Sequence, residues 1–550
     1  MSPPGRPRGE FRSAQREGTP EKRTGGLRRV AAWAVAGLAL LAISMGVWQL
    51  ERARQGVSIV SQRLGTTPVT VFRPMQSSGP TPVVLIAHGF AGSQQLMQPF
   101  ALTLARNGYV AITFDFPGHG RNAAPMTGGL ADQNESLRVL LKAMDQMGAY
   151  ASRLAGTGAG ADIRPGPYAV LGHSMASDII VRHAQTHPAV QASVGVSLFA
   201  PSITATTPPD SPRNLLVIDG GLEPQVMAAE ALRVVGGAAG PAAAQDVTYG
   251  RFTDGTARRA TLSPGVEHIG VLYSAHTLGE SLAWLDQAFG RPPAQRPFID
   301  ARGPWLGLLL LGVVALAWPL SHLLPRTVGR ELALPRELPH PGWRAWRRQF
   351  ALALVPAVLT PLLLWKLPTN FLPLLLGDYL ALHFMLYGVL TLAGLVWSGR
   401  RLPRPNAVVL AGAIVLASAW ALLSIGVPVD RYVFNVSPES VRLPLIAVLF
   451  ASALPYFLAD EWLTRGAGAA PGAYLLTKLC FLLSLVGAIA LNPERLFFLA
   501  IIVPAILLLF VVYGLFSRWA GRASGHPAVA AVSNALAFGA FIAVTFPLVA

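Results

Sequence analysis

The segment YAVLGHSMA (168–176) places a serine, Ser174, where its hydroxyl could be presented for chemistry. An apolar run suited to a buried strand precedes Ser174, and an amphipathic helical stretch, 177–185, follows it. A sharp strand-to-helix turn of this kind lifts a serine hydroxyl above a sheet, provided that the flanking residues are tiny. Gly172 meets this need, and Ala176 stands where the G-x-S-x-G pattern has its second glycine. The segment predicts that Ser174 is a nucleophile.

Four further loops carry residues that could support acyl transfer at Ser174. Each ends or follows an apolar run of strand length: HGFAGS (88–93), DFPGHG (115–120), GGLEP (220–224) and PGVEH (264–268). In the first loop the backbone N–H of Phe90 could face the serine. Together with the N–H of Met175, it would form an oxyanion hole for the charge of the transition state. A serine hydroxyl also needs a base to take its proton and a carboxylate to orient that base.

The elements that must position these loops lie between residues 51 and 303. Apolar runs of strand length occur at 57–64, 69–73, 83–88, 109–116, 168–173, 192–199, 214–219 and 257–263. The first two alternate polar and apolar residues like a hairpin, and most of the others are continuous enough to be covered on both faces. Helical stretches separate them, at 96–108, 135–155, 177–185, 225–235 and 277–289. This alternation predicts an α/β fold with a doubly wound, mostly parallel, eight-stranded sheet. The 200–213 connection is too short for a cap domain.

The chain as a whole is too apolar for a soluble protein of its length. Mean hydropathy is +0.44 and only 13% of the 550 residues are charged. Residues 30–50 are long enough to span a bilayer and follow a basic, Pro- and Gly-rich tail, 1–29, that we expect to be disordered. We interpret 30–50 as an uncleaved signal-anchor, with a cleaved signal peptide as the alternative. Residues 304–550 contain eight more apolar segments, at 304–324, 349–367, 371–397, 406–426, 441–459, 473–491, 496–516 and 528–549.

Arginines concentrate in alternate loops of this all-α membrane region. They lie at 326–348, at 400–404 and at 518–522, whereas the loops between them carry little charge. The positive-inside rule then places the basic N-terminal tail in the cytoplasm, and both the 51–303 domain and the C-terminus on the opposite side. The same arginines explain the net charge of +16, so we expect no nucleic-acid partner. Glu461 and Arg465 can pair at one helix end.

The order HGFAGS, DFPGHG, GHSMA, a carboxylate and then a histidine before a final helix resembles the α/β-hydrolase superfamily over residues 57–290. The resemblance implies that Ser174 is the nucleophile, His268 the general base and Glu223 the acid that orients it. Phe90 and Met175 would supply backbone donors. Asp219 is the alternative acid and His276 the alternative base. The resemblance implies neither a metal nor a cofactor.

The other histidines of these segments have plainer interpretations. His88, His119 and His173 belong to the motif loops and are expected to bond nearby backbone. His183 and His187, near the end of the helix that follows Ser174, are interpreted as solvated.

These patterns predict a membrane-anchored serine hydrolase that cleaves an ester, thioester or amide of a small-molecule, lipid or peptide substrate. Two alternatives stay open: a transporter or acyltransferase in which the membrane bundle carries the main function, and a non-catalytic binding domain. Usage rich in Arg, Ala, Gly and Pro indicates the cytoplasmic membrane of a bacterium. The oligomeric state and the role of the bundle are not determined by the sequence.

Overall fold

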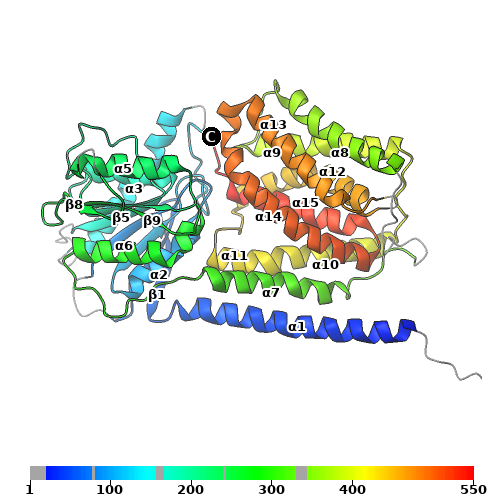
Figure 1. The fold of residues 1–550 in the computed structure, drawn as a ribbon, viewed down its shortest axis with the longest axis horizontal. Helices are drawn as coiled ribbons and strands as arrows, with labels where there is room; N and C mark the ends of the chain where they lie inside the picture. The colour runs from blue at the N-terminus through cyan, green and yellow to red at the C-terminus, as the bar shows by residue number, and fades with distance from the viewer. Residues whose placement is uncertain are drawn as a thin grey trace, which may run out of the picture.

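The computed structural model describes residues 20–76, 81–129, 132–156, 166–239, 243–329, 343–466 and 469–550. An α/β region and a bundle of long helices lie side by side (Figure 1). Residues 1–19 of the predicted tail and 330–342 of the first arginine-rich loop lie outside the described residues. Helix α1 begins at Pro20, before the predicted span at residue 30.

The described part of the α/β region contains one nine-stranded sheet, in the order β1-β2-β4-β3-β5-β6-β7-β9-β8. The strands are β1 Val57–Leu64, β2 Thr67–Pro74, β3 Val83–Ala87, β4 Val110–Phe114, β5 Tyr168–His173, β6 Val190–Val196, β7 Leu215–Gly220, β8 Thr248–Tyr249 and β9 Arg258–Ser263. The central strands pair in parallel, whereas β1, β2 and β8 pair antiparallel with their neighbours. The predicted mostly parallel sheet is confirmed. The strand that was not predicted is β8, which has two residues and is too short to give a periodic signal.

Helices cover both faces of the sheet (Figure 1). One face carries α2 Gln98–Arg106 and α6 Ala275–Ala288, and the other carries α3 Gln133–Ala155, α4 Met175–Thr186 and α5 Gln225–Ala239. Along β3, Val84 and Ile86 join the core on the α2 side, and Val83 and Leu85 join the core on the α3 side. Because successive side chains of a strand point to opposite faces, this strand must be apolar throughout.

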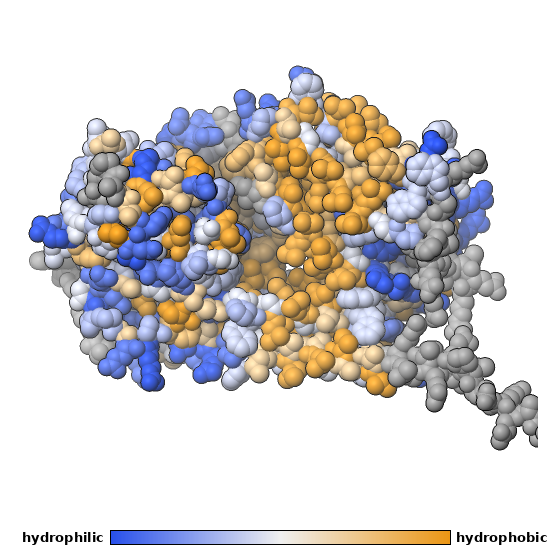
Figure 2. All heavy atoms as spheres, in the orientation of Figure 1, coloured by the Kyte–Doolittle hydropathy of each residue, from blue (hydrophilic) through white to orange (hydrophobic). Residues whose placement is uncertain are grey.

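Nine helices of the described residues are long and apolar enough to cross a membrane, as predicted: one near the N-terminus and eight in the C-terminal region. They are α1 Pro20–Arg52, α7 Gly303–Ser321, α8 Trp343–Leu364, α9 Gly377–Trp397, α10 Ala407–Trp420 continued by α11 Gly426–Tyr432, α12 Leu443–Arg465, α13 Ala473–Leu491, α14 Pro493–Ser524 and α15 Pro527–Thr545. Figure 2 shows apolar side chains gathered over the bundle and a hollow between the bundle and the α/β region.

The bundle incorporates α1 through close backbone packing. A side chain at Gly46 would place its Cβ 2.8 Å from the Cβ of Leu309 in α7, and one at Gly312 would place it 2.9 Å from the backbone oxygen of Ala39 in α1. Small residues at such crossings let membrane helices approach closely.

Two predicted spans are longer than the helices that the structure shows. α9 begins at Gly377 instead of 371, and α15 ends at Thr545 instead of 549. The N–H of Leu375 donates to the oxygen of Pro547 at 3.0 Å, and the N–H of Leu548 donates to Gly118 at 2.9 Å. These apolar residues therefore pair as extended backbone, which joins the bundle to the α/β region.

Candidate active site

Ser174 occupies a strained turn between β5 and α4. Its backbone has φ 52° and ψ −118°. A non-glycine residue rarely adopts a positive φ, and holding it there costs on the order of 1–3 kcal/mol. A Cβ at Gly172 would lie 2.7 Å from the oxygen of Ala176, so the strand and helix meet only because residue 172 is glycine. Ala176 is fully buried, and its methyl group is accommodated in the core.

The structure brings Ser174, His268 and Glu223 together although they lie far apart in the sequence. His268 Nε2 lies 2.9 Å from Ser174 Oγ, and His268 Nδ1 lies 2.5 Å from Glu223 Oε1. A carboxylate only accepts hydrogen bonds, so Nδ1 carries the hydrogen and Nε2 is free to accept the serine proton. This tautomer is the one that a general base needs.

Glu223 is held by two further donors. The hydroxyl of Ser197 donates to Glu223 Oε2 at 2.9 Å, and the N–H of Gly220 donates to the same oxygen at 2.6 Å. Burial opposes ionisation of this carboxyl, but the hydrogen bonds from His268, Gly220 and Ser197 outweigh it and lower the pKa of Glu223. The carboxylate is therefore charged and fixed in orientation when it meets the imidazole.

The structure does not bring the alternative acid and base to Ser174. Asp219 is buried at the end of β7, where Oδ1 accepts the N–H of Leu198 at 3.1 Å. Burial raises the pKa of Asp219 to about 7. His276 lies at the start of α6, with its Nε2 3.4 Å from the hydroxyl of Thr261.

The two predicted oxyanion donors flank the serine. A Cβ at Gly89 would lie 3.1 Å from the Cβ of Ser174, so the 88–93 loop comes close to Ser174 immediately before Phe90. Met175 is the first residue of α4, where a helix leaves its N–H groups without intrahelical acceptors. Both positions suit backbone donation towards an oxygen bound at Ser174.

The histidines of the motif loops support this site through backbone contacts. His88 Nε2 accepts the N–H of Phe116 at 3.1 Å, and His173 Nε2 lies 3.0 Å from the backbone oxygen of His268. Burial lowers the pKa of His173 to about 3, and the pKa of His119 also to about 3. These rings are therefore neutral over the ordinary pH range.

The interpretation of His183 as solvated is wrong. His183 is fully buried, with Nδ1 2.6 Å from Asp145 and Nε2 2.7 Å from the hydroxyl of Tyr168. Asp145, His183 and His187 each offer one ligand atom, and these atoms lie within 4.8 Å of one another. Such a cluster could hold a metal ion. However, both ring nitrogens of His183 already have partners in the protein, so the cluster is complete as a hydrogen-bonded unit.

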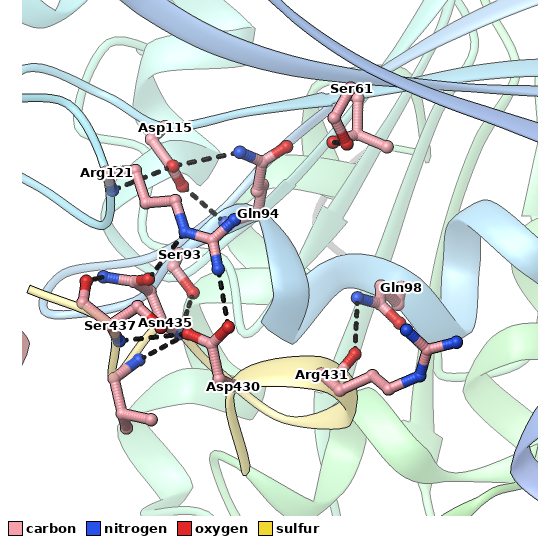
Figure 3. A network of polar contacts seen from close by, with 12 residues as sticks. Ser61, Ser93, Gln94, Gln98, Asp115, Arg121, Asp430, Arg431, Asn435 and Ser437 are labelled. Carbon is pink, nitrogen blue, oxygen red and sulfur yellow. Dashed lines mark hydrogen bonds and ion pairs between the residues drawn. The ribbon is translucent and has the colours of Figure 1, made fainter. Parts of the chain in front are cut away.

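The loops next to Ser174 are attached to the membrane bundle by polar contacts (Figure 3). Arg121 binds Asp430 at 2.6 Å, and the hydroxyl of Ser93 accepts the N–H of Asn435 at 2.9 Å. Gln98 donates to the backbone of Arg431 at 3.1 Å. These contacts link the 88–98 and 115–122 segments to the chain that follows α10.

An aromatic contact also joins the bundle to the oxyanion loop, residues 88–93, which contains Phe90. The ring centroid of Phe90 lies 4.7 Å from that of Phe498 in α14. Sequence analysis missed Phe498, because nothing local marks one phenylalanine of an apolar helix. It also missed Ser197, although a hydroxyl at the end of an apolar strand is a usable signal.

The chain is similar to one protein family and to several solved structures. Residues 78–227 match the Serine aminopeptidase, S33, family, and no curated protein is similar to the chain. Similar solved structures include a predicted CIB-like hydrolase from Thermoplasma acidophilum (15% identity, 42% of this chain and 99% of that one, TM-score 0.30). A putative α/β hydrolase from Agrobacterium tumefaciens is 14% identical (42% and 97%, TM-score 0.31), and a bacterial membrane phospholipase A also 14% (49% and 99%, TM-score 0.29).

The matched segment spans β3 to the start of α5 and includes Ser174 and Glu223. The family match over residues 78–227, together with the sheet order, identifies the α/β region as an α/β-hydrolase fold, carried on a chain with nine potential membrane spans among its described residues. The chain is thus a hydrolase of the α/β type.

Proposed function

We propose that the protein is a membrane-anchored serine hydrolase that cleaves an ester, thioester or amide through an acyl-enzyme on Ser174. The single observation that carries this proposal is the hydrogen-bonded series Ser174–His268–Glu223, at 2.9 Å and 2.5 Å. It begins at a serine whose backbone is strained. Strain of this kind persists only where the surrounding fold enforces it, and it is concentrated at active sites.

The reaction follows from the order of the three side chains. Ser174 Oγ attacks the carbonyl carbon while His268 Nε2 takes its proton, and Glu223 stabilises the resulting imidazolium. The N–H groups of Phe90 and Met175 hold the negative oxygen of the tetrahedral intermediate. His268 then protonates the leaving alcohol, thiol or amine, and the carbon–heteroatom bond breaks. Water, deprotonated by His268, attacks the acyl carbon; the bond to Ser174 Oγ breaks, Oγ takes the proton back from His268, and the carboxylic acid leaves.

Turnover of an activated soluble ester tests this mechanism. The purified full chain in detergent should hydrolyse 4-methylumbelliferyl acetate, and Ser174→Ala or His268→Ala should each lower kcat/KM by about 10³-fold or more. His276→Ala is the matched histidine control, and its kcat/KM should stay close to that of the unchanged protein. Equal loss in His268→Ala and His276→Ala would contradict the assigned base.

We also propose that the hydrolase domain faces the outside of a bacterial cytoplasmic membrane, with the N-terminus in the cytoplasm. The arginine-rich loops support this orientation. Close packing of α1 against α7 supports an uncleaved anchor. In a Cys480→Ala background, cysteine at Val60 should react with an impermeant maleimide in intact cells, and cysteine at Arg401 should react only after lysis. The reverse pattern would overturn the orientation.

A further inference from the structure

The catalytic edge of the sheet faces the membrane bundle. The carboxyl ends of parallel strands lie at one edge of a sheet, and the loops after β3, β4 and β5 meet there. Two of these loops contact the bundle: Phe90 packs on Phe498, and the backbone oxygen of Gly118 accepts from Leu548 at 2.9 Å and from Arg442 at 2.7 Å. Ser174, at the end of the neighbouring β5, therefore opens towards the same side.

The contact at Phe498 gives the depth of the site relative to the bilayer. Glu494 and Arg495 form the charged start of α14, and Phe498 follows Arg495 by three residues, about 4.5 Å along the helix axis. Its neighbour Phe497 is 61% exposed on the outside of the bundle. The oxyanion loop thus lies where the polar end of a span passes into its apolar stretch. That is the level at which headgroups meet hydrocarbon, and where the ester carbonyls of lipids lie.

Four large apolar side chains that lie next to the triad residues, in the chain or through a backbone hydrogen bond, are well exposed among the described residues. These mouth residues are Phe199, Leu222, Val226 and Ile269, which are 58%, 66%, 65% and 44% exposed. Leu222 and Ile269 adjoin Glu223 and His268 in the chain, and Val226, the second residue of α5, follows Glu223 by three residues.

A backbone hydrogen bond places Phe199 close to the turn that carries Ser174. The N–H of Phe199 donates to the hydroxyl of Ser177, which lies one turn after Ser174 in α4. Exposed apolar side chains that gather at one place mark contact with a lipid or an apolar ligand. The hollow between the bundle and the α/β region opens beside this edge (Figure 2).

We infer that the substrate is an acyl ester of a lipid held in the same bilayer. The inference depends on the serine hydrolase activity proposed above. The acyl chain lies along the mouth residues and Phe498, while the carbonyl carbon reaches Ser174 Oγ. A bond forms between Oγ and this carbon, the ester C–O bond breaks, and the alcohol leaves with the proton from His268. Water then releases the fatty acid, which remains in the membrane.

A pair of esters with one leaving group tests the inference. 4-Methylumbelliferyl oleate partitions into dioleoylphosphatidylcholine vesicles, whereas the acetate ester stays in water. With the full chain reconstituted in these vesicles, kcat/KM for the oleate should exceed that for the acetate by about tenfold or more, because the longer chain binds apolar surface. Fluorophosphonate labelling of Ser174 in the same vesicles reports the nucleophile independently.

Two exposed valines provide a matched pair of variants. Val226 is a mouth residue, whereas Val247, 42% exposed, precedes β8, the last strand in the sheet order, which is separated from β7 by β9. Val226→Ser should lower the oleate-to-acetate ratio about threefold to tenfold. Val247→Ser should change this ratio by less than about twofold.

Three results would overturn the inference, and they are distinguishable. If Ser174 is labelled and the acetate is cleaved while the oleate is not, the lipid substrate is excluded and the hydrolase stands. If both valine variants change the ratio equally, the mouth residues do not bind the acyl chain. If Ser174 is not labelled and neither ester is cleaved, the proposed function itself fails.

Discussion

Two groups of buried acids and bases in this protein differ in how they are held. In the hydrolase domain, Glu223 and His268 are joined to a serine with φ 52°, and the His268 side chain is 34% exposed. In the bundle, Lys478 binds Asp460 at 2.6 Å, with side chains 5% and 4% exposed. Arg465 binds Glu461 at 2.9 Å, as the sequence predicts.

The difference separates a site that can react from one that holds helices together. The bundle group has two acids and two bases on regular helices, and Thr477 adds a hydrogen bond to Asp460 at 3.0 Å. The two positive and two negative charges of this group therefore offset one another. The Ser174 group has a strained backbone and an exposed imidazole, which a substrate can reach. Exposure and strain, more than the presence of charge, therefore mark the catalytic group.

The largest effect should come from the acid of the triad. Glu223→Gln removes the charge that stabilises the His268 imidazolium and should lower kcat/KM by about 10³ to 10⁴-fold. Asp219→Asn is the matched control on the same connection, because its carboxyl bonds Leu198 and not His268. Steady-state hydrolysis of the acetate ester measures both. A larger loss in Asp219→Asn would mean that Asp219 is the acid.

Breaking the bundle group should change stability and leave the serine reactive. Lys478→Met leaves Asp460 as an unpaired buried charge and should lower the free energy of unfolding by about 3–5 kcal/mol. Lys366→Met, at an exposed lysine that stacks on Trp365, should have little effect. Thermal unfolding followed by fluorescence measures the difference. If Lys478→Met keeps its stability and loses fluorophosphonate labelling, the bundle group takes part in the reaction.

A smaller effect should appear when Glu223 loses one supporting donor. Ser197→Ala removes a hydrogen bond that favours the ionised carboxyl, so the pKa of Glu223 rises. Activity needs the ionised form, so the acidic limb of the kcat/KM profile should move to higher pH. Ser193→Ala removes the same atom within β6, the strand that Ser197 directly follows, and away from Glu223. Identical profiles for the two variants would contradict this role of Ser197.

Much of the fold and the turn that presents Ser174 can be predicted because their signals are local. β5, the turn at Ser174 and α4 are consecutive, and strands buried on both faces are apolar throughout. The nine potential spans are equally visible in composition.

The rest depends on contacts between distant segments. The choice between Glu223 and Asp219 depends on where the 264–268 loop places His268 relative to the end of β7. The 371–376 segment is as apolar as a helix, but Leu374 bridges Leu548, and the N–H groups of Phe371 and Leu372 donate to the side chain of Asp378. Phe498 acquires a role from Phe90, which lies in another domain.

The most direct test of the central claim is to locate the fluorophosphonate adduct by peptide mass spectrometry of the detergent-solubilised full chain. The structure predicts a single modified residue, Ser174, with labelling lost in Ser174→Ala and in His268→Ala and retained in Lys478→Met at a temperature where that variant is folded. Labelling at another residue, or none on folded protein, would contradict the assignment of the α/β domain as the catalytic part and direct the search to the membrane bundle.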